Sequence, residues 1–465
     1  MKNYILLLLS FFCFQGVYAL ELPSFFSDGM LLQQSDSVSI FGWEKAKTSV
    51  RISSSWGEEV ECRSNKSGFW SVKLKTPKGS FDTHQLSIKG KESITIKDIL
   101  IGEVWLASGQ SNMEWSASAG LMNDSTEIKN AHQPMVRIFK AERNKDGKEG
   151  AKVEGEWLIM TPKTMPYVSV VSYFFATKLK NQLMVPVGVI TTSWGGTPIE
   201  TWIPKKALQN DKDLWASSQK LKPNPWGPVE QGLLYNGMVA PFKDYTISGL
   251  LWYQGEANVE FPELYAEKLK LLGEIWRQQF KKNLPLYYVQ IAPYHYGDNI
   301  NAAKLRDQQR RTMNILSNSK MLVISDVADL NDIHPINKKP VGHRLANIAL
   351  KDHYGILTKE VYSPVIERIF TDYYGRLHLA FKNAKGLHFA SSDINYFEVG
   401  NEQSTAKATD ISIENDQIIL KSPIENPEWV RFAFTNSATP GIVNEGGIPV
   451  SCFDKIVFIK EKKVQ

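Results

Sequence analysis

Short runs of alternating apolar and polar residues fill the chain between residues 20 and 100. The runs are VSIFGW, SVRISSSW, FWSVKLKT, HQLSIKG and SITIKDI, and Gly, Pro, Asn and Lys separate them. A period of two is typical of a strand that buries one face. Several short strands at regular spacing predict a small β-sandwich-like domain over 20–100.

From about residue 101, continuous apolar runs alternate with amphipathic stretches. The apolar runs are GEVWLAS, PMVRIF, VPVGVITTS, SGLLWYQ, LPLYYVQIA and KMLVISDV. The stretches 167–183, 262–280 and 336–351 predict helices between or after these runs. Continuous apolar strands that alternate with helices imply a parallel sheet covered on both faces. We therefore predict a three-layer α/β domain over 101–352.

The last part of the chain, 353–465, returns to short β-type runs such as RLHLAF, ISIENDQIILKS, VRFAFT and KIVFIK. These runs predict a C-terminal β-rich region. It is either a sandwich of its own or a partner of the N-terminal β domain.

The first 19 residues have the pattern of a secretory signal peptide. A Lys near the start precedes an apolar stretch, and small residues end the segment at Ala19. The apolar stretch is shorter than the roughly 20 residues that a membrane span needs. We expect cleavage after Ala19 and an exported protein, periplasmic or extracellular, without a membrane span.

Charge and cysteine content exclude several function classes. The chain has 54 Lys and Arg against 49 Asp and Glu, a net charge of +5 with no basic block, so nucleic-acid binding is not indicated. No Cys-x-x-Cys pair or His-x-x-x-His cluster indicates a metal site. Cys62 and Cys452 remain after removal of the signal peptide. They are compatible with free thiols or with a disulfide, which would tie the two β regions if these pack together.

Four segments at the ends of predicted strands carry polar residues. They are GQSN at 109–112, SWGGT at 193–197, QGEAN at 254–258 and the segment from Asp326 to NDIHP at 331–335. In open parallel sheets, ligands bind beyond the carboxyl ends of the strands. We therefore expect these four segments to form one site.

Together the segments hold the groups that acyl transfer needs. Ser111 is the candidate nucleophile and His334 the candidate base. Backbone amides of Ser111 and of Gly195 or Gly196, with the side-chain amide of Gln254, are candidate donors to an oxyanion. The four segments thus predict a serine esterase or a related hydrolase.

Other residues near these segments have less specific roles. Pro335 disfavours helical geometry at His334 and keeps this residue on a loop before the helix. His343 falls inside the helical pattern and is expected to pack, while His295 lies in an aromatic loop and is not expected to be the base. Glu256 is either a group behind the catalytic pair or part of a surface ion pair.

The sequence also resembles a known family. The segments GEVWLASGQSNMEW, SWGGTPIETW, WYQGEAN and DIHPINKKPVGHRLA are similar to the motif blocks of the sialate O-acetylesterase family, part of the SGNH hydrolase superfamily. FFSDGMLLQQSDSVSIFGW and VRFAFTNSATPGIVNEGGIPVSCF resemble its outer β regions. The resemblance implies a flavodoxin-like fold and no cofactor. It also implies Ser111 as nucleophile, His334 as base, and Gly196 and Gln254 in the oxyanion hole.

The group that orients His334 departs from the superfamily pattern. Many SGNH hydrolases have Asp three residues before the His, but this position is Asn331. Asp332 is charged and two residues away, on the same side of an extended segment. We place Asp332 first, a backbone carbonyl second and Glu256 third.

The expected activity is removal of O-acetyl groups from a carbohydrate, with sialic acid as the first choice. An alternative substrate is acetyl xylan or another polysaccharide. A non-catalytic carbohydrate-binding protein and a glycosidase that uses Glu256 and Asp326 are alternatives of other classes.

Overall fold

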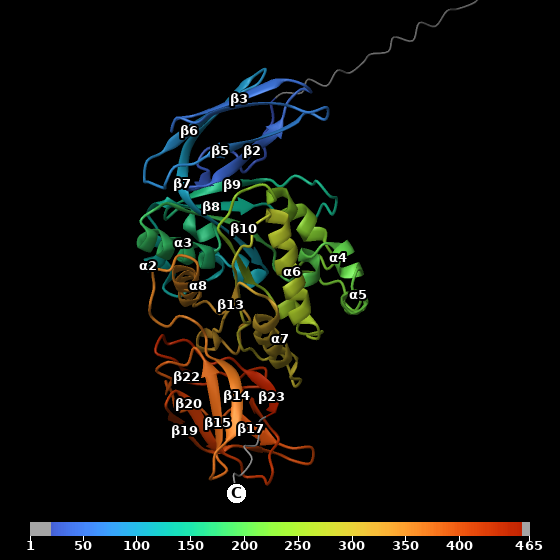
Figure 1. Ribbon diagram of the computed structural model, residues 1–465, viewed down its shortest axis with the longest axis vertical. Helices are drawn as coiled ribbons and strands as arrows, with labels where there is room; N and C mark the ends of the chain where they lie inside the picture. Colours follow the sequence, from blue (N-terminus) through green and yellow to red (C-terminus); the bar gives the residue numbers. More distant parts are fainter. Residues whose placement is uncertain (1–19, 458–465) are drawn as a thin grey trace, which may run out of the picture.

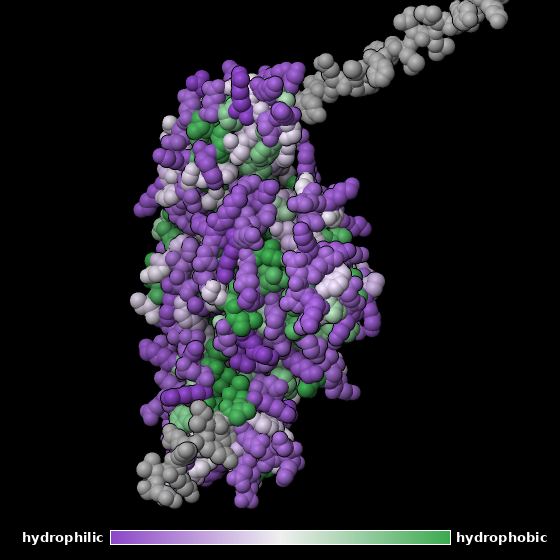
Figure 2. All heavy atoms as spheres, turned by 45° about the vertical axis from the view of Figure 1, so that its right-hand side comes forward, coloured by the Kyte–Doolittle hydropathy of each residue, from purple (hydrophilic) through white to green (hydrophobic). Residues whose placement is uncertain are grey.

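The computed structural model describes residues 20–457 and shows a mixed α/β centre between two β-rich ends (Figure 1). The predicted signal peptide lies outside the described residues. In the described part of the chain, no helix is long and apolar enough to cross a membrane. Figure 2 shows one face of the molecule as mostly hydrophilic, with apolar side chains in separate groups.

The N-terminal β region contains the strands that the alternating runs predict. β2 pairs with β5, β3 pairs with β4 and β6, and β6 pairs with the start of β7, all antiparallel. The strands are β1 (Leu31–Gln33), β2 (Ser37–Trp43), β3 (Ser49–Ser54), β4 (Glu59–Arg63), β5 (Phe69–Lys75), β6 (His84–Lys89) and β7 (Ser93–Gly109).

One strand, β7, passes through the boundary that we predict at residue 100. Its first part pairs with β6, its middle with β1, and residues 103–109 pair with β10 and β11. Burial along β7 changes from alternating to continuous at the same place. The N-terminal region and the central sheet are therefore built on a shared strand.

The central sheet has the strand order β13-β12-β11-β7-β10-β8-β9. Neighbouring strands are parallel except for β8 and β9, which are antiparallel. The parallel sheet predicted from the continuous apolar runs is confirmed. The strands are β8 (Gln133–Ala141), β9 (Gly155–Met160), β10 (Val187–Ser193), β11 (Gly249–Tyr253), β12 (Leu286–Val289) and β13 (Ser319–Leu322).

Helices bury both faces of this sheet. Trp105 and Leu251 face the apolar cluster that contains α3 (Val170–Leu183) and α8 (Lys339–Asp352). Leu106 and Leu250, their neighbours in sequence, face the cluster of α6 (Tyr265–Phe280) and α7 (Asn301–Ile315), since successive side chains of a strand point to opposite faces. The predicted helices correspond to α3, α6 and α8, whereas α7 was not predicted.

Shorter helical segments lie in the connections. The α-helical ones are α1 (Ser111–Glu114), α2 (Asp124–Lys129), α4 (Lys205–Gln209) and α5 (Lys212–Ser218). The others, 3-10 except for the π-helical η4, are η1 (Ala117–Ala119), η2 (Met165–Tyr167), η3 (Ile199–Trp202), η4 (Tyr235–Val239), η5 (Ala240–Phe242), η6 (Glu256–Asn258) and η7 (Ser325–Val327).

The C-terminal β region has an apolar core of its own and two four-stranded sheets, β14-β15-β20-β19 and β18-β17-β21-β23, beside the pair β16-β22. Its strands are β14 (Val365–Thr371), β15 (Leu377–Lys382), β16 (His388–Phe389), β17 (Phe397–Gly400), β18 (Thr405–Lys407), β19 (Thr409–Glu414), β20 (Gln417–Lys421), β21 (Trp429–Phe432), β22 (Ile442–Val443) and β23 (Phe453–Val457).

The two β regions lie at opposite ends of the molecule (Figure 1). Cys62 in β4 and Cys452 next to β23 are both free thiols. Of the two alternatives that the sequence leaves open, the free thiols are found and the disulfide between the first and last β regions is not. Its condition, that these regions pack together, is not met, and a disulfide needs Cα atoms within about 7 Å.

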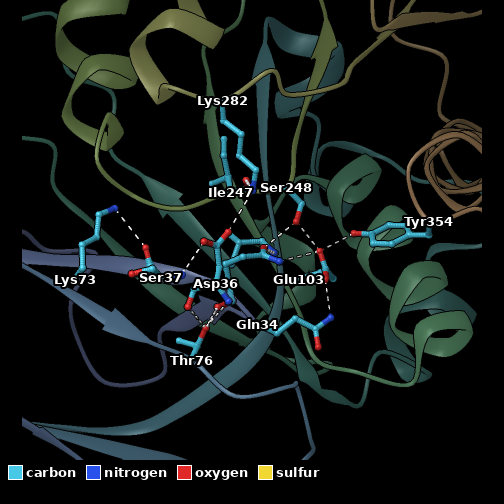
Figure 3. A network of polar contacts seen from close by, with 12 residues as sticks. Gln34, Asp36, Ser37, Lys73, Thr76, Glu103, Ile247, Ser248, Lys282 and Tyr354 are labelled. Carbon is cyan, nitrogen blue, oxygen red and sulfur yellow. Dashed lines mark hydrogen bonds and ion pairs between the residues drawn. The ribbon is translucent and has the colours of Figure 1, made fainter. Parts of the chain in front are cut away.

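The buried carboxylate of Glu103 links the N-terminal region to the end of the central sheet that lies away from Ser111 (Figure 3). Glu103, at the start of the parallel part of β7, accepts hydrogen bonds from Gln33 (3.1 Å), Gln34 (2.6 Å), Ser248 (2.5 Å) and Tyr354 (2.8 Å). Four donors offset the cost of burying this group. The network lies at the end of the sheet that is remote from Ser111.

Candidate active site

Ser111 sits where β7 turns into a helix. Gly109 ends the strand with a φ of +141°, and a Cβ on it would lie 2.1 Å from the carbonyl oxygen of Tyr253. Only glycine fits this turn between parallel strands. The turn makes Ser111 the first residue of α1, half-buried at the carboxyl edge of the sheet.

His334 reaches Ser111 from the loop before α8. Its Nε2 lies 2.9 Å from Ser111 Oγ. The imidazole stacks on the indole of Trp115, with ring centroids 4.5 Å apart and planes 16° apart. Burial and the cation of Lys338 lower the pKa of His334, against the opposing effect of Asp332. A neutral imidazole at this distance can accept the proton of the serine.

Of the candidate orienting carboxylates, Asp332 lies nearest to the other ring nitrogen. Asp332 Oδ1 is 3.6 Å from His334 Nδ1, longer than a hydrogen bond, and accepts the backbone N–H of His334 at 2.8 Å. Asn331 is exposed, and its side chain makes no hydrogen bond with the described residues. Glu256 Oε1 accepts a hydrogen bond from Asn112 Nδ2 at 2.5 Å. Asn112 therefore lies between this carboxylate and the loop that carries the imidazole.

The two glycines after β10 have different roles. The amide of Gly195 donates to Glu114 Oε2 at 2.8 Å and is therefore occupied. The amide of Gly196 makes no hydrogen bond within residues 20–457. Gly196 has a φ of +72°, and a Cβ there would lie 2.3 Å from that of Trp226. Of the two candidates, Gly196 is the one whose N–H is available to an oxyanion.

The structure contradicts the prediction that Gln254 donates to the oxyanion. The side chain is fully buried, and its Nε2 lies within hydrogen-bond distance of Gln110 Oε1 (3.1 Å), the Thr197 carbonyl (3.1 Å) and Asn258 Oδ1 (2.8 Å). Its Oε1 accepts from Tyr265. Gln254 braces the loops behind the site because all of its polar atoms have protein partners.

Ser111 and His334 open into a cleft of about 1100 Å³. Gly196 and Glu256 also line it, and Trp226, which is 75% exposed, forms part of its wall. Its basic lining residues are Lys140, Arg143 and Lys222.

Comparison with known proteins identifies the family of the chain. The family described as carbohydrate esterase, sialic acid-specific acetylesterase, matches residues 101–351. The chain belongs to this family. It is a carboxylic ester hydrolase, and the alternative of a non-catalytic binding protein is not supported.

Relatives match over most of their length. The sialate O-acetylesterase of Rattus norvegicus is 28% identical over 411 residues, covering 74% of this chain and 76% of its own. That of Homo sapiens is 28% identical over 387 residues, covering 74% and 73%. A solved carbohydrate acetylesterase from Xanthomonas citri has a TM-score of 0.84 and 29% identity, covering 94% of this chain and 99% of its own.

The other titratable candidates of this esterase lie away from the cleft. Asp326 binds Arg344 through both oxygens, at 2.8 and 2.6 Å, and does not line the cleft. The carboxylate pair of a glycosidase is therefore not formed with Glu256. His343 packs edge-on against Phe174 in α3, as expected of a packing residue.

Four residues that support the site were missed from sequence: Asn112, Glu114, Trp115 and Lys338. Three of them follow Ser111 directly in SNMEW, and Lys338 comes four residues after His334. Their closeness to the catalytic pair was a usable signal. What each touches depends on the turn of α1 and on the start of α8, which spacing alone does not define.

Proposed function

We propose that this esterase hydrolyses O-acetyl esters of carbohydrate, with sialic acid as the acetylated sugar. The observation that carries the proposal is the 2.9 Å contact between Ser111 Oγ and His334 Nε2 on the floor of the cleft. The relatives whose names give sialate O-acetylesterase activity support the choice of sugar.

The reaction proceeds through an acetyl-enzyme. Ser111 Oγ attacks the acetyl carbonyl while His334 Nε2 takes the hydroxyl proton, and the amides of Ser111 and Gly196 receive the oxyanion. Collapse of the tetrahedral intermediate expels the sugar oxygen, which takes the proton from His334. Water then attacks the acetyl group with His334 again as base, releasing acetate and restoring the serine.

The proposal includes an SGNH hydrolase fold with flavodoxin-like layering. Without the edge pair β8–β9, the sheet order is β10-β7-β11-β12-β13. Numbered along the chain, this is 2-1-3-4-5, the order of flavodoxin-like sheets. Helices on both faces support the three-layer arrangement.

We also propose that the protein is exported to the periplasm or beyond the cell. Support comes from the Lys, apolar stretch and small residues of 1–19, which have the order of a secretory signal.

A neutral acetylated polysaccharide is the second candidate substrate. A sialic acid carries a carboxylate, yet each basic residue that lines the cleft already has a protein partner. Arg143 pairs with Glu114 at 2.7 Å, Lys222 pairs with Glu260 at 3.1 Å, and Lys140 donates to the Tyr167 carbonyl. An open cleft without an unpaired cation favours an uncharged chain such as acetylated xylan.

Acetate release tests both candidates. We expect the full chain to release acetate from O-acetylated sialic acid faster than from acetylated xylan, with 4-nitrophenyl acetate as a general ester. Ser111→Ala is the control and is expected to lower kcat about a thousandfold or more while the circular dichroism spectrum is unchanged. Turnover of xylan alone would select the second candidate. A fully active Ser111→Ala variant would contradict the mechanism.

A further inference from the structure

Lys338 is a buried lysine four residues after His334, at the start of α8. Its exposed fraction is 1%. Lysines are almost never fully buried unless they are paired. Burial lowers the pKa of Lys338 to about 7, against the opposing effects of Glu256 and Asp332. Costly groups of this kind gather at functional sites.

The ammonium group is held by one neutral acceptor between two aromatic rings. Nζ donates to Asn112 Oδ1. It lies 5.9 Å from the ring centroid of Trp115 and 5.6 Å from that of Tyr253. Asn112 Nδ2 donates in turn to Glu256 Oε1. The amide dipole of Asn112 therefore bridges a buried cation and a buried carboxylate.

Two of these contacts lead directly to His334. Trp115 stacks on the imidazole, and Asn112 Nδ2 also donates to the carbonyl of Ile333 at 3.0 Å. Lys338 therefore contacts Trp115, which stacks on the imidazole, and Asn112, which binds the peptide carbonyl before His334. Without the ammonium, the Asn112 amide would keep its bonds to Glu256 and Ile333 but lose the donor that binds its oxygen.

We propose that Lys338 is a positioning residue of this esterase: through Asn112 and Trp115, its ammonium group holds the imidazole of His334 against Ser111. This role rests on the proposed roles of Ser111 and His334. It also has an electrostatic part, because the cation disfavours a second positive charge on the imidazole.

The groups that face His334 define the pH dependence. They are Asp332 on its own loop, Lys338 on α8, Ser111 on α1 and, across Asn112, Glu256 after β11. The positive charge of Lys338 lowers the pKa of His334, whereas the carboxylate of Asp332 raises it. Removing the cation raises the pKa of His334.

The test is the pH profile of kcat and KM for 4-nitrophenyl acetate with the full chain. We expect Lys338→Met to lower kcat by about tenfold to a hundredfold with little change in KM, and to move the rising limb to higher pH. Lys338→Arg keeps the cation and should restore the wild-type midpoint and part of kcat.

A second buried lysine provides the matched control. Lys268, on α6, is also 1% exposed and forms an ion pair with Glu200 at 2.6 Å. Lys268→Met should lower the melting temperature but leave the midpoint of the pH profile unchanged. A folded Lys338→Met variant with wild-type kcat and midpoint would overturn the proposal.

Asn112→Ala keeps the proposal testable if Lys338→Met does not fold. This variant removes the link to Ile333 and should lower kcat, with a smaller shift of the midpoint since the cation remains. Wild-type kcat in folded Asn112→Ala would overturn the proposal. An active Ser111→Ala variant would instead show that the proposed mechanism itself is wrong.

Discussion

At the scale of single residues, His334 balances opposing influences. Burial and Lys338 lower its pKa, and Asp332 raises it. The net lowering keeps the imidazole neutral at pH 7, as a general base requires. A base that is neutral without a tight carboxylate partner relies on its surroundings for orientation, which the Trp115 stack supplies.

The first prediction concerns the pH profile of the wild type. We expect kcat/KM for acetate release to rise with pH, with a midpoint below the usual value of about 6.5 for a histidine. His334→Ala should remove this limb and most of the activity. A midpoint above 7 in the wild type would show that the surroundings of His334 do not lower its pKa.

The second prediction compares two neighbouring residues. Asp332 lies 3.6 Å from Nδ1, whereas the exposed Asn331 side chain has no partner among residues 20–457. Asp332→Asn should lower kcat/KM by about tenfold and shift the midpoint to lower pH, because an anion that favours the imidazolium is lost. Asn331→Ala is the control and should change neither. Equal effects of the two substitutions would remove Asp332 from the mechanism.

At the scale of elements, sequence patterns recover the strands that are apolar throughout, such as β10 and β11, and the strands and helices that separate apolar from polar faces. β5, β6, α6 and α8 follow this rule. α7 does not, because it buries Arg306, Gln309 and Arg310. Gln309 donates to the Gln254 carbonyl, and Arg306 donates to the Asn436 carbonyl at 3.0 Å. Its buried apolar residues, such as Ala302 and Leu305, are interrupted by these polar groups, so the chain shows no purely apolar face there.

The candidate site, like the secondary structure, can be predicted from the sequence only in part. The positions of the strand ends in the sequence predict that Ser111 and the glycine loop lie close together, because parallel strands share one carboxyl edge. Gln254 sits at the same edge, yet its side chain points into the protein, where four partners hold it. The sequence can locate a residue at an edge, but it does not define the direction of a side chain that bends into a loop network.

The third prediction concerns α8 and acid stability. Burial, with the cations of Lys178 and Lys339, lowers the pKa of His343 to about 4. The unfolded chain binds a proton near pH 6.5 that the folded helix does not, so stability is lost as pH falls from 6.5 towards 4. His343→Leu should lose less free energy of unfolding between pH 7 and 4.5 than the wild type, measured with urea. An identical loss would show that His343 does not titrate in this way.

At the scale of the whole molecule, the family match begins at residue 101, inside β7. The fourth prediction is that residues 101–352 alone do not form a stable unit. Removing the preceding segment takes away β1 and β6 and exposes Phe139, Phe242 and Tyr245, buried residues that pack on Phe25 in the intact protein. We expect aggregation of this fragment in size-exclusion chromatography, with the chain 20–457 as control. A monomeric, cooperatively unfolding fragment would contradict this view.

The same strand limits how the molecule can move. The seventeen residues of β7 run from the N-terminal region into the central sheet without a loop, with one irregularity at Asp98, whose φ is +52°. Domain closure requires a few residues that absorb a large change in φ and ψ, and paired strand residues cannot do so. Asp98 is held to β8 by its ion pair with Arg137, and β1 pairs with the next residues of β7, Leu100 to Gly102, so these contacts oppose a swing of the N-terminal region over the cleft. Access to Ser111 is left to the loops at the sheet's carboxyl edge.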